Sequence, residues 1–250
     1  MISAAAQTLP DVRPGERTGP AGQGITNRIL RKLSDQEFQI IRPHLEYIDL
    51  PHHLTLHQPH RRVRHAHFPN SGLISLVVEL KDGKTVEAGL LGKEGAAGIP
   101  ALLGLERSAL REVVQIPGAG FRASVESLRG LLSATPGLHA LLSRYAASLA
   151  MQVAQTAACN RLHTIEKRLA RWLLIAQDRI DSGIIPITHD FLATMLGTDR
   201  PSVTVAAGVL QDAEVLQYRR GSVKVVNRKK LEQFACECYE VVRQYDGDLS

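Results

Sequence analysis

The polar side chains at the start of one predicted helix are suited to nucleic-acid contact. Arg200, Ser202 and Thr204 fall on the exposed face of a helix that begins after Asp199. These side chains lack apolar bulk and can meet phosphates or base edges. Asp199 can cap the helix, because its carboxylate accepts hydrogen bonds from the free amides of the first turn. The pattern predicts a helix whose N-terminal end meets DNA.

A basic hairpin is predicted after this helix. Two short apolar runs, at 215–218 and 223–226, flank a tip that contains Arg219 and Arg220, and Lys224 lies on the second run. Guanidinium groups at a hairpin tip can reach the phosphate backbone of DNA. The alternative is a plain solvated turn. The position of the hairpin after a pair of helices favours the wing of a winged helix.

Residues 188–213 must position these side chains, and they read as two helices broken at Gly197. Gly197 suits the tight turn because it has no side chain to obstruct the backbone. Thr188, which opens the segment, joins the residues predicted to contact DNA. The alternative is an ordinary helical hairpin in a protein core. Apolar residues recur at helical spacing in both helices, namely Phe191, Leu192, Met195 and Leu196, then Val203, Ala206, Ala207 and Leu210.

Composition excludes several classes of protein. The 250 residues suffice for two domains, and the net charge of +5 permits an anionic partner. No apolar run approaches the roughly 20 residues of a membrane span, and the N-terminus lacks the pattern of a signal peptide. We find no nucleophile–base grouping, phosphate-binding glycine loop or paired carboxylates in a motif, so no enzyme activity is predicted. A cytoplasmic protein is expected.

The three cysteines are too few and too dispersed for a disulfide framework or an all-cysteine zinc site. They are Cys159, Cys236 and Cys238. The spacing of Cys236 and Cys238 does not by itself indicate a metal pair, and both are interpreted as packing residues or free thiols. Reduced thiols fit a cytosolic protein.

The chain divides into four predicted parts. Residues 1–24 read as a disordered tail. Residues 25–136 begin with short helices, where Ser34 and Glu37 form a capping-box pattern, and continue as short strands separated by Gly and Pro turns. A hairpin turn is predicted at 81–84, where Gly83 would supply a positive φ. Such strands predict a β-barrel or jelly-roll-like domain. A long helix at 137–182 and a winged helix at 183–250 complete an α+β fold.

Seven of the ten histidines lie between His44 and His67 and raise the question of a metal site. His65 and His67 would share one face of a strand, as zinc ligands can. No obvious set of further ligands lies nearby, and the neighbouring arginines would oppose a cation. Surface and strand histidines are the favoured interpretation, and no metal is predicted.

The long helix, from about 138 to 181, carries an apolar heptad seam in its first half. Such a seam predicts pairing with another chain. The alternative is packing on the chain's own β domain, and both can hold at this length. The seam continues with polar residues, Gln152 and Thr156 among them, that could set register or meet a ligand. The predicted dimer residues are Leu138, Leu142, Tyr145 and Leu149.

The order of β domain, long helix, helix-turn-helix and basic hairpin resembles the Crp-Fnr family of bacterial transcription regulators over about residues 25–245. Its most specific segments are 166–173 (EKRLARWL), 187–197 (ITHDFLATMLG) and 200–204 (RPSVT). The resemblance implies that the helix after the glycine enters the major groove. The family's first recognition arginine falls on Arg200. The family's acidic base-contacting residue falls on Pro201, and its second arginine falls on Val205. Neither can make polar base contacts, so the DNA sequence recognised must differ from that of the best-known family members.

The nucleotide pocket of the family is only partly matched. Segment 95–98 resembles its glycine-bearing segment, but Ala96 stands where a ribose-binding glutamate would be. Arg107 and Ser108 match the phosphate-binding pair. The family's iron–sulfur cysteines are absent, and no cofactor is predicted. A weakly supported effector pocket would contain Gly92, Gly95, Arg107, Ser108, Gln152 and Thr156.

The sequence therefore predicts a homodimeric, sequence-specific DNA-binding regulator that acts on a two-fold DNA site. The resemblance implies double-stranded DNA, a second copy of the chain and RNA polymerase as partners, with an effector that is unidentified or absent and no membrane partner. The alternative is a ligand-binding regulatory subunit or an enzyme that uses the β-barrel pocket.

Overall fold

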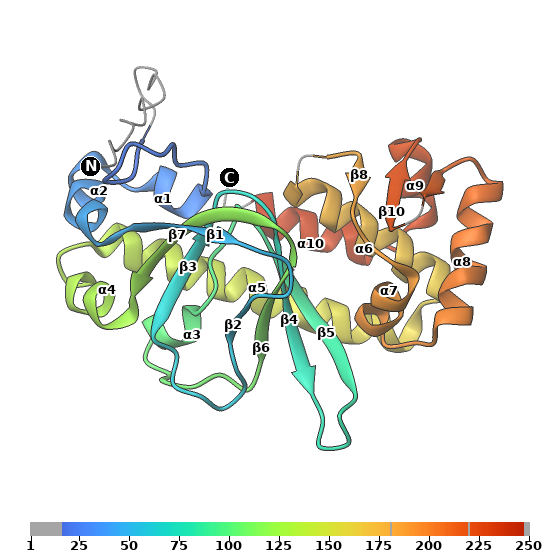
Figure 1. Cartoon of the computed structure of the whole chain (residues 1–250), viewed down its shortest axis with the longest axis horizontal. Coiled ribbons are helices and arrows are strands. Elements are labelled where there is room, and N and C mark those ends of the chain that lie inside the picture. The colour runs from blue at the N-terminus through green and yellow to red at the C-terminus, as the bar shows by residue number, and fades with distance from the viewer. Residues whose placement is uncertain (1–16, 181, 220, 248–250) are drawn as a thin grey trace, which may run out of the picture.

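The chain forms two lobes joined by one long helix. The computed structural model describes residues 17–180, 182–219 and 221–247. In Figure 1 the β domain lies at one end, the winged-helix domain lies at the other, and α5 (Pro136–Leu162) passes behind both. None of the described helices combines the length and the apolar character needed to span a bilayer.

Residues 17–24 are held against the first helices, which corrects the prediction of a disordered tail over 1–24. Arg42 donates hydrogen bonds to the Thr18 carbonyl at 2.8 Å and to the Gly19 carbonyl at 3.0 Å. Thr18 also bridges to Gly24 in antiparallel fashion. These backbone bonds give the segment partners that composition alone does not reveal. Residues 1–16 lie outside the described residues.

Three short helical elements cover one end of the β domain. They are α1 (Arg28–Lys32), α2 (Asp35–Ile41) and the 3-10 helix η1 (Arg42–His44). Ser34 caps α2 as predicted, since its Oγ accepts from the Glu37 amide at 3.3 Å and donates to Glu37 Oε2 at 3.1 Å.

The β domain consists of two antiparallel sheets that enclose one apolar core. One sheet has the order β1-β7-β3, and the other has the order β2-β6-β4-β5. Phe68 and Phe121 from the first sheet and Leu76 from the second are buried in the same core. The strands are β1 (Glu46–Leu50), β2 (Thr55–His57), β3 (His65–Pro69), β4 (Leu73–Glu79), β5 (Thr85–Leu91), β6 (Arg111–Ile116) and β7 (Gly118–Ser124).

This arrangement confirms the predicted jelly-roll-like domain within an α+β fold. It is not a closed barrel, because among the described strands no edge strand of one sheet pairs with an edge strand of the other. The predicted hairpin joins β4 to β5, where Gly83 adopts φ +82° and the Leu80 amide donates to the Lys84 carbonyl at 2.9 Å. Helices α3 (Ile99–Leu102) and α4 (Val125–Leu131) flank the sheets.

The clustered histidines of the β domain have protein partners. His57 Nδ1 lies 2.6 Å from Glu112 Oε2, and His57 Nε2 lies 2.8 Å from the His65 carbonyl. Burial lowers the pKa of His57, but the bond to Glu112 outweighs it and the net shift is upward. Burial and the charge of His57 lower the pKa of His67 to about 3. His67 is therefore a neutral core residue.

The long helix predicted for 138–181 is interrupted. Helix α5 ends at Leu162, His163 is extended with φ −111° and ψ 151°, and α6 (Ile165–Ile180) starts a new direction. If α5 continued as one helix, the apolar residues Leu169 and Trp172 would lie away from the β domain. The break instead lets α6 fold back, so that Leu169 and Trp172 share a core with Leu73 of β4.

The apolar seam predicted for the dimer faces inward. Leu138, Leu142 and Tyr145 are buried in the core of the β domain, and Leu149 packs against it. This corrects the assignment of these residues to an interface and supports the alternative of packing on the chain's own sheets. Any second copy must use another face of α5.

Two buried polar contacts join α6 to the β domain. Trp172 Nε1 donates to Glu87 Oε1 at 2.8 Å, and Ser75 Oγ donates to Glu87 Oε2 at 2.6 Å. Arg179 Nε lies 2.8 Å from Glu94 Oε1, with both side chains almost fully buried. These contacts hold α6, which leads into the C-terminal lobe, against β5 and the segment that follows it.

Replacing Glu87 with glutamine is expected to flatten the pH dependence of stability. Burial raises the pKa of Glu87 from 4.5 to about 7, against the bonds from Ser75 and Trp172. Between these values the unfolded chain releases the proton and the folded chain keeps it, so the wild-type free energy of unfolding falls as pH rises. At 1.36 kcal/mol per pH unit the fall reaches roughly 3 kcal/mol.

Urea denaturation from pH 4.5 to 8 measures this difference between wild type and Glu87→Gln. The free energy of unfolding of the variant should rise steadily relative to that of the wild type as pH increases through this range. Glu79→Gln, on the half-exposed end of β4, is the matched control. A constant difference across the window would contradict a protonated Glu87.

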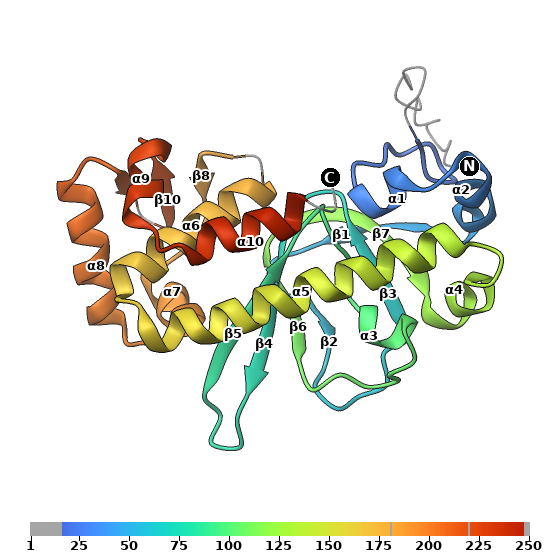
Figure 2. The same ribbon diagram turned by 180° about the vertical axis from the view of Figure 1, so that it is seen from behind.

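The C-terminal lobe is a winged helix. It contains α7 (His189–Leu196) and α8 (Arg200–Asp212), followed by β9 (Leu216–Arg219) and β10 (Ser222–Val225), with β8 (Ile184–Ile185) paired to β10. The chain after β10 forms two helices, α9 (Arg228–Phe234) and α10 (Cys238–Gly247), separated by an extended Ala235. This turn sends α10 back along α5 (Figure 2).

Candidate nucleic-acid interface

The turn between α7 and α8 forms from the predicted local signals. Gly197 ends α7 with φ +60°, a conformation that favours glycine. Asp199 caps α8, since its Oδ1 accepts from the Ser202 amide at 2.9 Å and its Oδ2 from Ser202 Oγ at 2.8 Å. Thr188 Oγ1 caps α7 by accepting from the Phe191 amide at 3.3 Å. The predicted helix-turn-helix is therefore present.

The polar residues at the start of α8 differ in their exposure and in the partners that their side chains already have. The Arg200 side chain is 63% exposed, and its Nη1 lies 3.2 Å from Asp190 Oδ2. An exposed ion pair of this kind is weak, so Arg200 can exchange Asp190 for DNA at little cost. Ser202 is engaged in the cap, whereas Thr204 is exposed and donates to the Arg200 carbonyl at 3.0 Å.

Two apolar residues share the exposed face of α8. Val205 is 65% exposed and Val209 is 42% exposed, one helical turn apart. Their packing neighbours on α8, Val203 and Ala206, are buried. The sequence indicates only that Val205 cannot make the polar base contact of the family's second arginine. The burial pattern shows that it projects from the reading face, where a valine can contact the methyl group of thymine.

The wing stands beside α8. Arg219 and Lys224 are exposed on β9 and β10, and Gly221 takes φ +76° in the turn. Arg220 lies outside the described residues. His189 stacks edge-on with Tyr218 of the wing at 4.4 Å between ring centroids, and its Nδ1 lies 3.1 Å from Thr204 Oγ1.

This stack makes α7, α8 and the wing one surface. Burial and the charge of Arg200 lower the pKa of His189, so its ring is neutral when the surface is formed. Burial raises the pKa of Tyr218, whose hydroxyl stays protonated. The positive charge of the surface therefore comes from its arginine and lysine side chains.

Gly92 and Gln152, two residues of the predicted effector pocket, both lie against Arg179. A Cβ at Gly92 would lie 2.9 Å from Arg179 Cβ, and one at Gly95 would lie 2.0 Å from the Tyr145 ring. Both glycines are thus explained by close packing. Gln152 is bonded to the backbone of Leu90 through both amide atoms, at 2.9 and 3.1 Å.

The other predicted pocket residues have their own partners. Thr156 Oγ1 accepts from Arg171 at 3.2 Å. Arg107 and Ser108 lie on the loop before β6. The backbone of Arg107 forms an antiparallel β-bridge with that of Arg62, and Ser108 Oγ accepts a hydrogen bond from the Leu110 amide at 3.1 Å. Arg179 of α6 lies against Gln152 at 3.3 Å.

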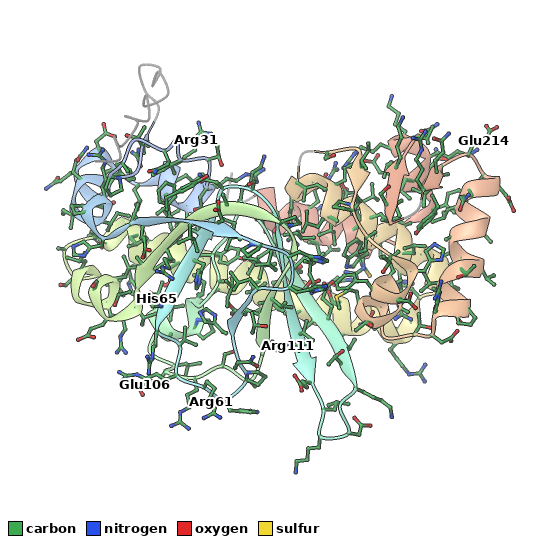
Figure 3. The ribbon with its side chains drawn as sticks, in the orientation of Figure 1. Arg31, Arg61, His65, Glu106, Arg111 and Glu214 are labelled. Carbon is green, nitrogen blue, oxygen red and sulfur yellow. The ribbon has the colours of Figure 1, made fainter. Side chains whose placement is uncertain are left out.

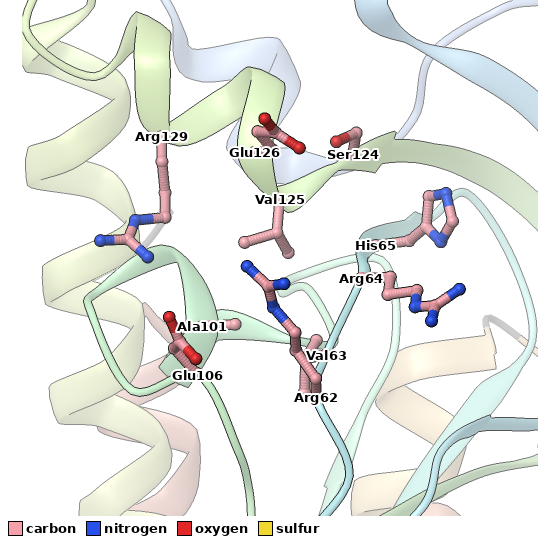
Figure 4. Close-up of a pocket in the computed structure, with 10 residues that line it drawn as sticks. All are labelled: Arg62, Val63, Arg64, His65, Ala101, Glu106, Ser124, Val125, Glu126 and Arg129. Carbon is pink, nitrogen blue, oxygen red and sulfur yellow. The ribbon is translucent and has the colours of Figure 1, made fainter.

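A surface cavity of about 650 Å³ lies elsewhere on the β domain. Figure 4 shows Arg62 and Arg129 facing Glu106 and Glu126 around it, and Figure 3 places His65 and Glu106 on the side of the β domain away from the wing. Because both charges line it, the cavity selects no single class of ionic ligand.

The uncovered face of α5 carries a second heptad pattern. Figure 2 shows α5 crossing the near side of the molecule, where none of the described elements lies over it. Met151 is 44% exposed, and small residues precede and follow it at spacings of three and four. The exposed seam consists of Ala140, Ala147, Met151, Ala154 and Ala158. Side chains this small allow two helices to approach closely.

Comparison with known proteins identifies the C-terminal lobe. A family model for the Crp-like helix-turn-helix domain matches residues 167–234, from the first turn of α6 to the end of α9. No curated protein matches the chain in sequence.

Solved structures share the whole fold. A Crp-Fnr family regulator from Eubacterium rectale has a TM-score of 0.65 and 15% identity, covering 82% of this chain and 96% of that one. The c-di-GMP-responsive global regulator Clp of Xanthomonas campestris gives 0.65 and 15%, covering 78% and 100%. A Crp-family regulator of Thermus thermophilus gives 0.61 and 18%, covering 75% and 96%. The chain therefore carries a Crp-like helix-turn-helix domain, and its overall fold is that of the Crp-Fnr transcription regulators.

Proposed function

We propose that this protein is a DNA-binding transcription regulator of the Crp-Fnr type that acts as a homodimer on a two-fold DNA site. The observation that carries the proposal is the continuous exposed surface of α8 and the wing, within the domain matched by the Crp-like family model. The proposal assigns the protein no catalytic role. It places the protein in the cytoplasm with the chromosome.

In this proposal α8 enters the major groove with its N-terminal end against the bases. Arg200 forms paired hydrogen bonds with a guanine, and Val205 and Val209 contact thymine methyl groups. Thr204 contacts a base edge or a phosphate. Arg219 and Lys224 bind phosphates, which fix the position of the protein on the duplex without reading its sequence. Thr188 and Ser202 keep the helix starts facing the DNA.

The proposed dimer places two α5 helices against each other through the exposed seam. Two alanine-rich helices related by a two-fold axis would bury Met151 of each chain against its counterpart. The two copies of α8 would then face half-sites about 34 Å apart, one turn of DNA. RNA polymerase and a small-molecule effector, which the Crp-Fnr resemblance implies, are further proposed partners whose binding residues this proposal does not assign.

Replacing Arg200 with alanine is expected to weaken binding to the preferred two-fold site by about 1–3 kcal/mol per half-site and to relax one base position. The guanidinium supplies the polar base contact that neither Pro201 nor Val205 can make. The measurement is affinity selection from a random DNA library, followed by fluorescence anisotropy on the selected site. Salt titration should show a steep loss of affinity for the wild type.

Two controls separate base reading from charge. Arg129→Ala removes an exposed arginine on α4, far from the wing, and should leave affinity unchanged. Lys224→Ala should weaken binding to all DNA equally and reduce the salt slope by about one per half-site, or roughly two for the dimer. If Arg200→Ala weakened random DNA as much as the selected site, Arg200 would be a phosphate contact. An affinity that is insensitive to salt would refute DNA binding by this surface.

A further inference from the structure

Three cysteines and one histidine that are distant in sequence meet at the break between the two lobes. Cys159 lies in the last turn of α5 and His163 directly follows that helix, while Cys236 lies in the turn between α9 and α10 and Cys238 begins α10. One ligand atom from each of the four residues lies within 4.8 Å of the others. All three thiols are buried and unpaired by disulfides.

The spacing of these atoms suits one tetrahedral ion. In a tetrahedral site with Zn–S distances of about 2.3 Å, neighbouring ligand atoms lie roughly 3.6–3.8 Å apart. Cys159 Sγ and Cys236 Sγ are 3.5 Å apart, and Cys238 Sγ and His163 Nδ1 are also 3.5 Å apart. Each pair joins one residue from the end of α5 with one residue from the turn between α9 and α10 or from the start of α10. The two pairs can therefore form opposite edges of one tetrahedron.

The surroundings match those of a built metal site. His163 turns Nδ1 toward Cys238, and its Nε2 lies 3.3 Å from Glu237 Oε1. A carboxylate on the second ring nitrogen is the usual partner of a histidine that binds a metal, because it fixes the ring and its tautomer. Gln155 Nε2 donates to Cys238 Sγ at 3.2 Å, as amides do toward thiolates.

Charge compensation is also present. Three thiolates and one Zn²⁺ carry a net charge of −1, which is costly to bury alone. The guanidinium groups of Arg168 and Arg171 are buried, and Arg171 Nη1 lies 3.2 Å from Thr156 Oγ1, one helical turn from Cys159 on α5. Among the described side chains, Arg168 has no carboxylate within ion-pair distance. The cluster supplies the anion that its buried charge requires.

We propose that Cys159, His163, Cys236 and Cys238 bind one Zn²⁺ ion that ties the DNA-binding lobe to the end of α5. Thiolate and imidazole ligands in tetrahedral geometry select zinc over magnesium or calcium. The four ligand atoms are too close together to surround an iron–sulfur cluster, in which the thiolates bind separate irons. Four protein ligands leave no open position, so the site is structural.

The position of the ion gives it a consequence for the fold. One ligand, His163, is the extended residue where α5 passes into α6. Cys159 precedes it on α5, and Cys236 and Cys238 belong to the C-terminal lobe. Zinc would therefore cross-link the two lobes at the one point where the chain between them is not helical. Loss of the metal would free α10 from α5 and loosen the orientation of the winged helix.

The first test is the metal content of the untagged full-length protein, purified without chelator after expression with zinc. Mass spectrometry of the metal should find one Zn²⁺ per chain. Replacement by Co²⁺ should give thiolate charge-transfer bands and the strong visible bands of a tetrahedral site. The surface histidines of the β domain cannot produce thiolate bands, so the spectrum separates this site from adventitious metal. Zinc should also protect all three thiols from Ellman's reagent until a chelator is added.

Variants locate the site. Cys236→Ser and His163→Ala should each lose the bound zinc, while His139→Ala, an exposed histidine on the same helix, should keep it. Circular dichroism checks folding, and the cobalt spectrum of the wild type decides the question if a variant does not fold. A folded wild type that binds no Zn²⁺ or Co²⁺ would overturn the proposal. A Cys159–Cys236 disulfide formed in its place would do the same and indicate a redox pair. Metal content is measured without DNA, so its outcome is independent of the proposed regulatory function.

Discussion

Replacing Ala147 and Ala154 together with glutamate is expected to convert the proposed dimer to monomers and to abolish tight binding to the proposed two-fold DNA site. Both residues lie on the exposed seam of α5, where a two-fold axis would bring each glutamate toward its counterpart. Like charges facing each other at close range repel, and the small side chains that allow close approach are lost. Joining two DNA-reading heads raises affinity by roughly 10²–10⁴, so the monomer should bind at least about 100-fold more weakly.

Analytical ultracentrifugation of the wild type and the variant gives the oligomeric state, and anisotropy on the selected two-fold site gives the affinity. His139→Glu places the same charge on an exposed, off-seam position of α5 and should remain dimeric. Circular dichroism should show the same secondary structure for both variants, since no group in the core of the single chain is changed, and the double variant should lose only the thermal stability that dimerisation supplies. A double variant that stays dimeric would show that α5 is not the interface through this seam.

Replacing Arg179 with alanine is expected to lower the free energy of unfolding by about 3–5 kcal/mol, because it leaves a carboxylate buried without its counter-charge. Arg179 contacts Glu94 at 2.8 Å, Gln152 at 3.3 Å and Asp246 at 3.2 Å, and so joins α6 to the β domain, α5 and α10. Burial raises the pKa of Glu94, and the charge of Arg179 opposes that rise. The loss should be larger at neutral pH than in acid, where a protonated Glu94 needs no partner.

Chemical denaturation at two pH values measures this loss. Arg243→Ala is the control, since Arg243 forms an exposed pair with Glu240 on α10 at 2.7 Å and its removal should cost less than about 1 kcal/mol. Arg179→Ala combined with Glu94→Gln should recover part of the stability, because the uncompensated charge is gone. Equal losses for Arg179→Ala and Arg243→Ala would show that the buried pair contributes nothing special.

The helix-turn-helix and the hairpin that follows it could be predicted because their signals are local. The turn needs Gly197 with a positive φ, the cap needs Asp199 within three residues of Ser202, and the wing needs a short hairpin. Each of these features is settled by residues that are neighbours in the chain. The same reasoning found the capping of α2 by Ser34 and the hairpin between β4 and β5.

Long-range packing decided which face of α5 is free. Both faces of this helix have heptad spacing, and the larger side chains of Leu138, Leu142 and Tyr145 made theirs the predicted interface. The β domain of the same chain buries that face first, because its sheets are tethered to α5 and offer more apolar surface than a second helix does. The alanine seam is left outside. Residue size alone cannot distinguish a core face from a dimer face.

The break at His163 had the same origin. The sequence continues a helical pattern through this point, yet α6 gains more by burying Trp172 and Arg179 against β4 and β5 than by extending α5. That turn also fills the space beside Gln152 with protein side chains. Gly92 and Gln152, which belong to the predicted effector pocket, therefore both lie against Arg179.

The sequence by itself determined the helix-turn-helix, its caps and its wing, since each depends on backbone preferences within a few residues. The tertiary structure alone decided the free face of α5, the packing of α6 on the β domain and the meeting of Cys159 and His163 with Cys236 and Cys238. Metal ligands and interfaces are defined by distances in space. Those distances follow from how the whole chain buries its apolar surface, which no local pattern specifies.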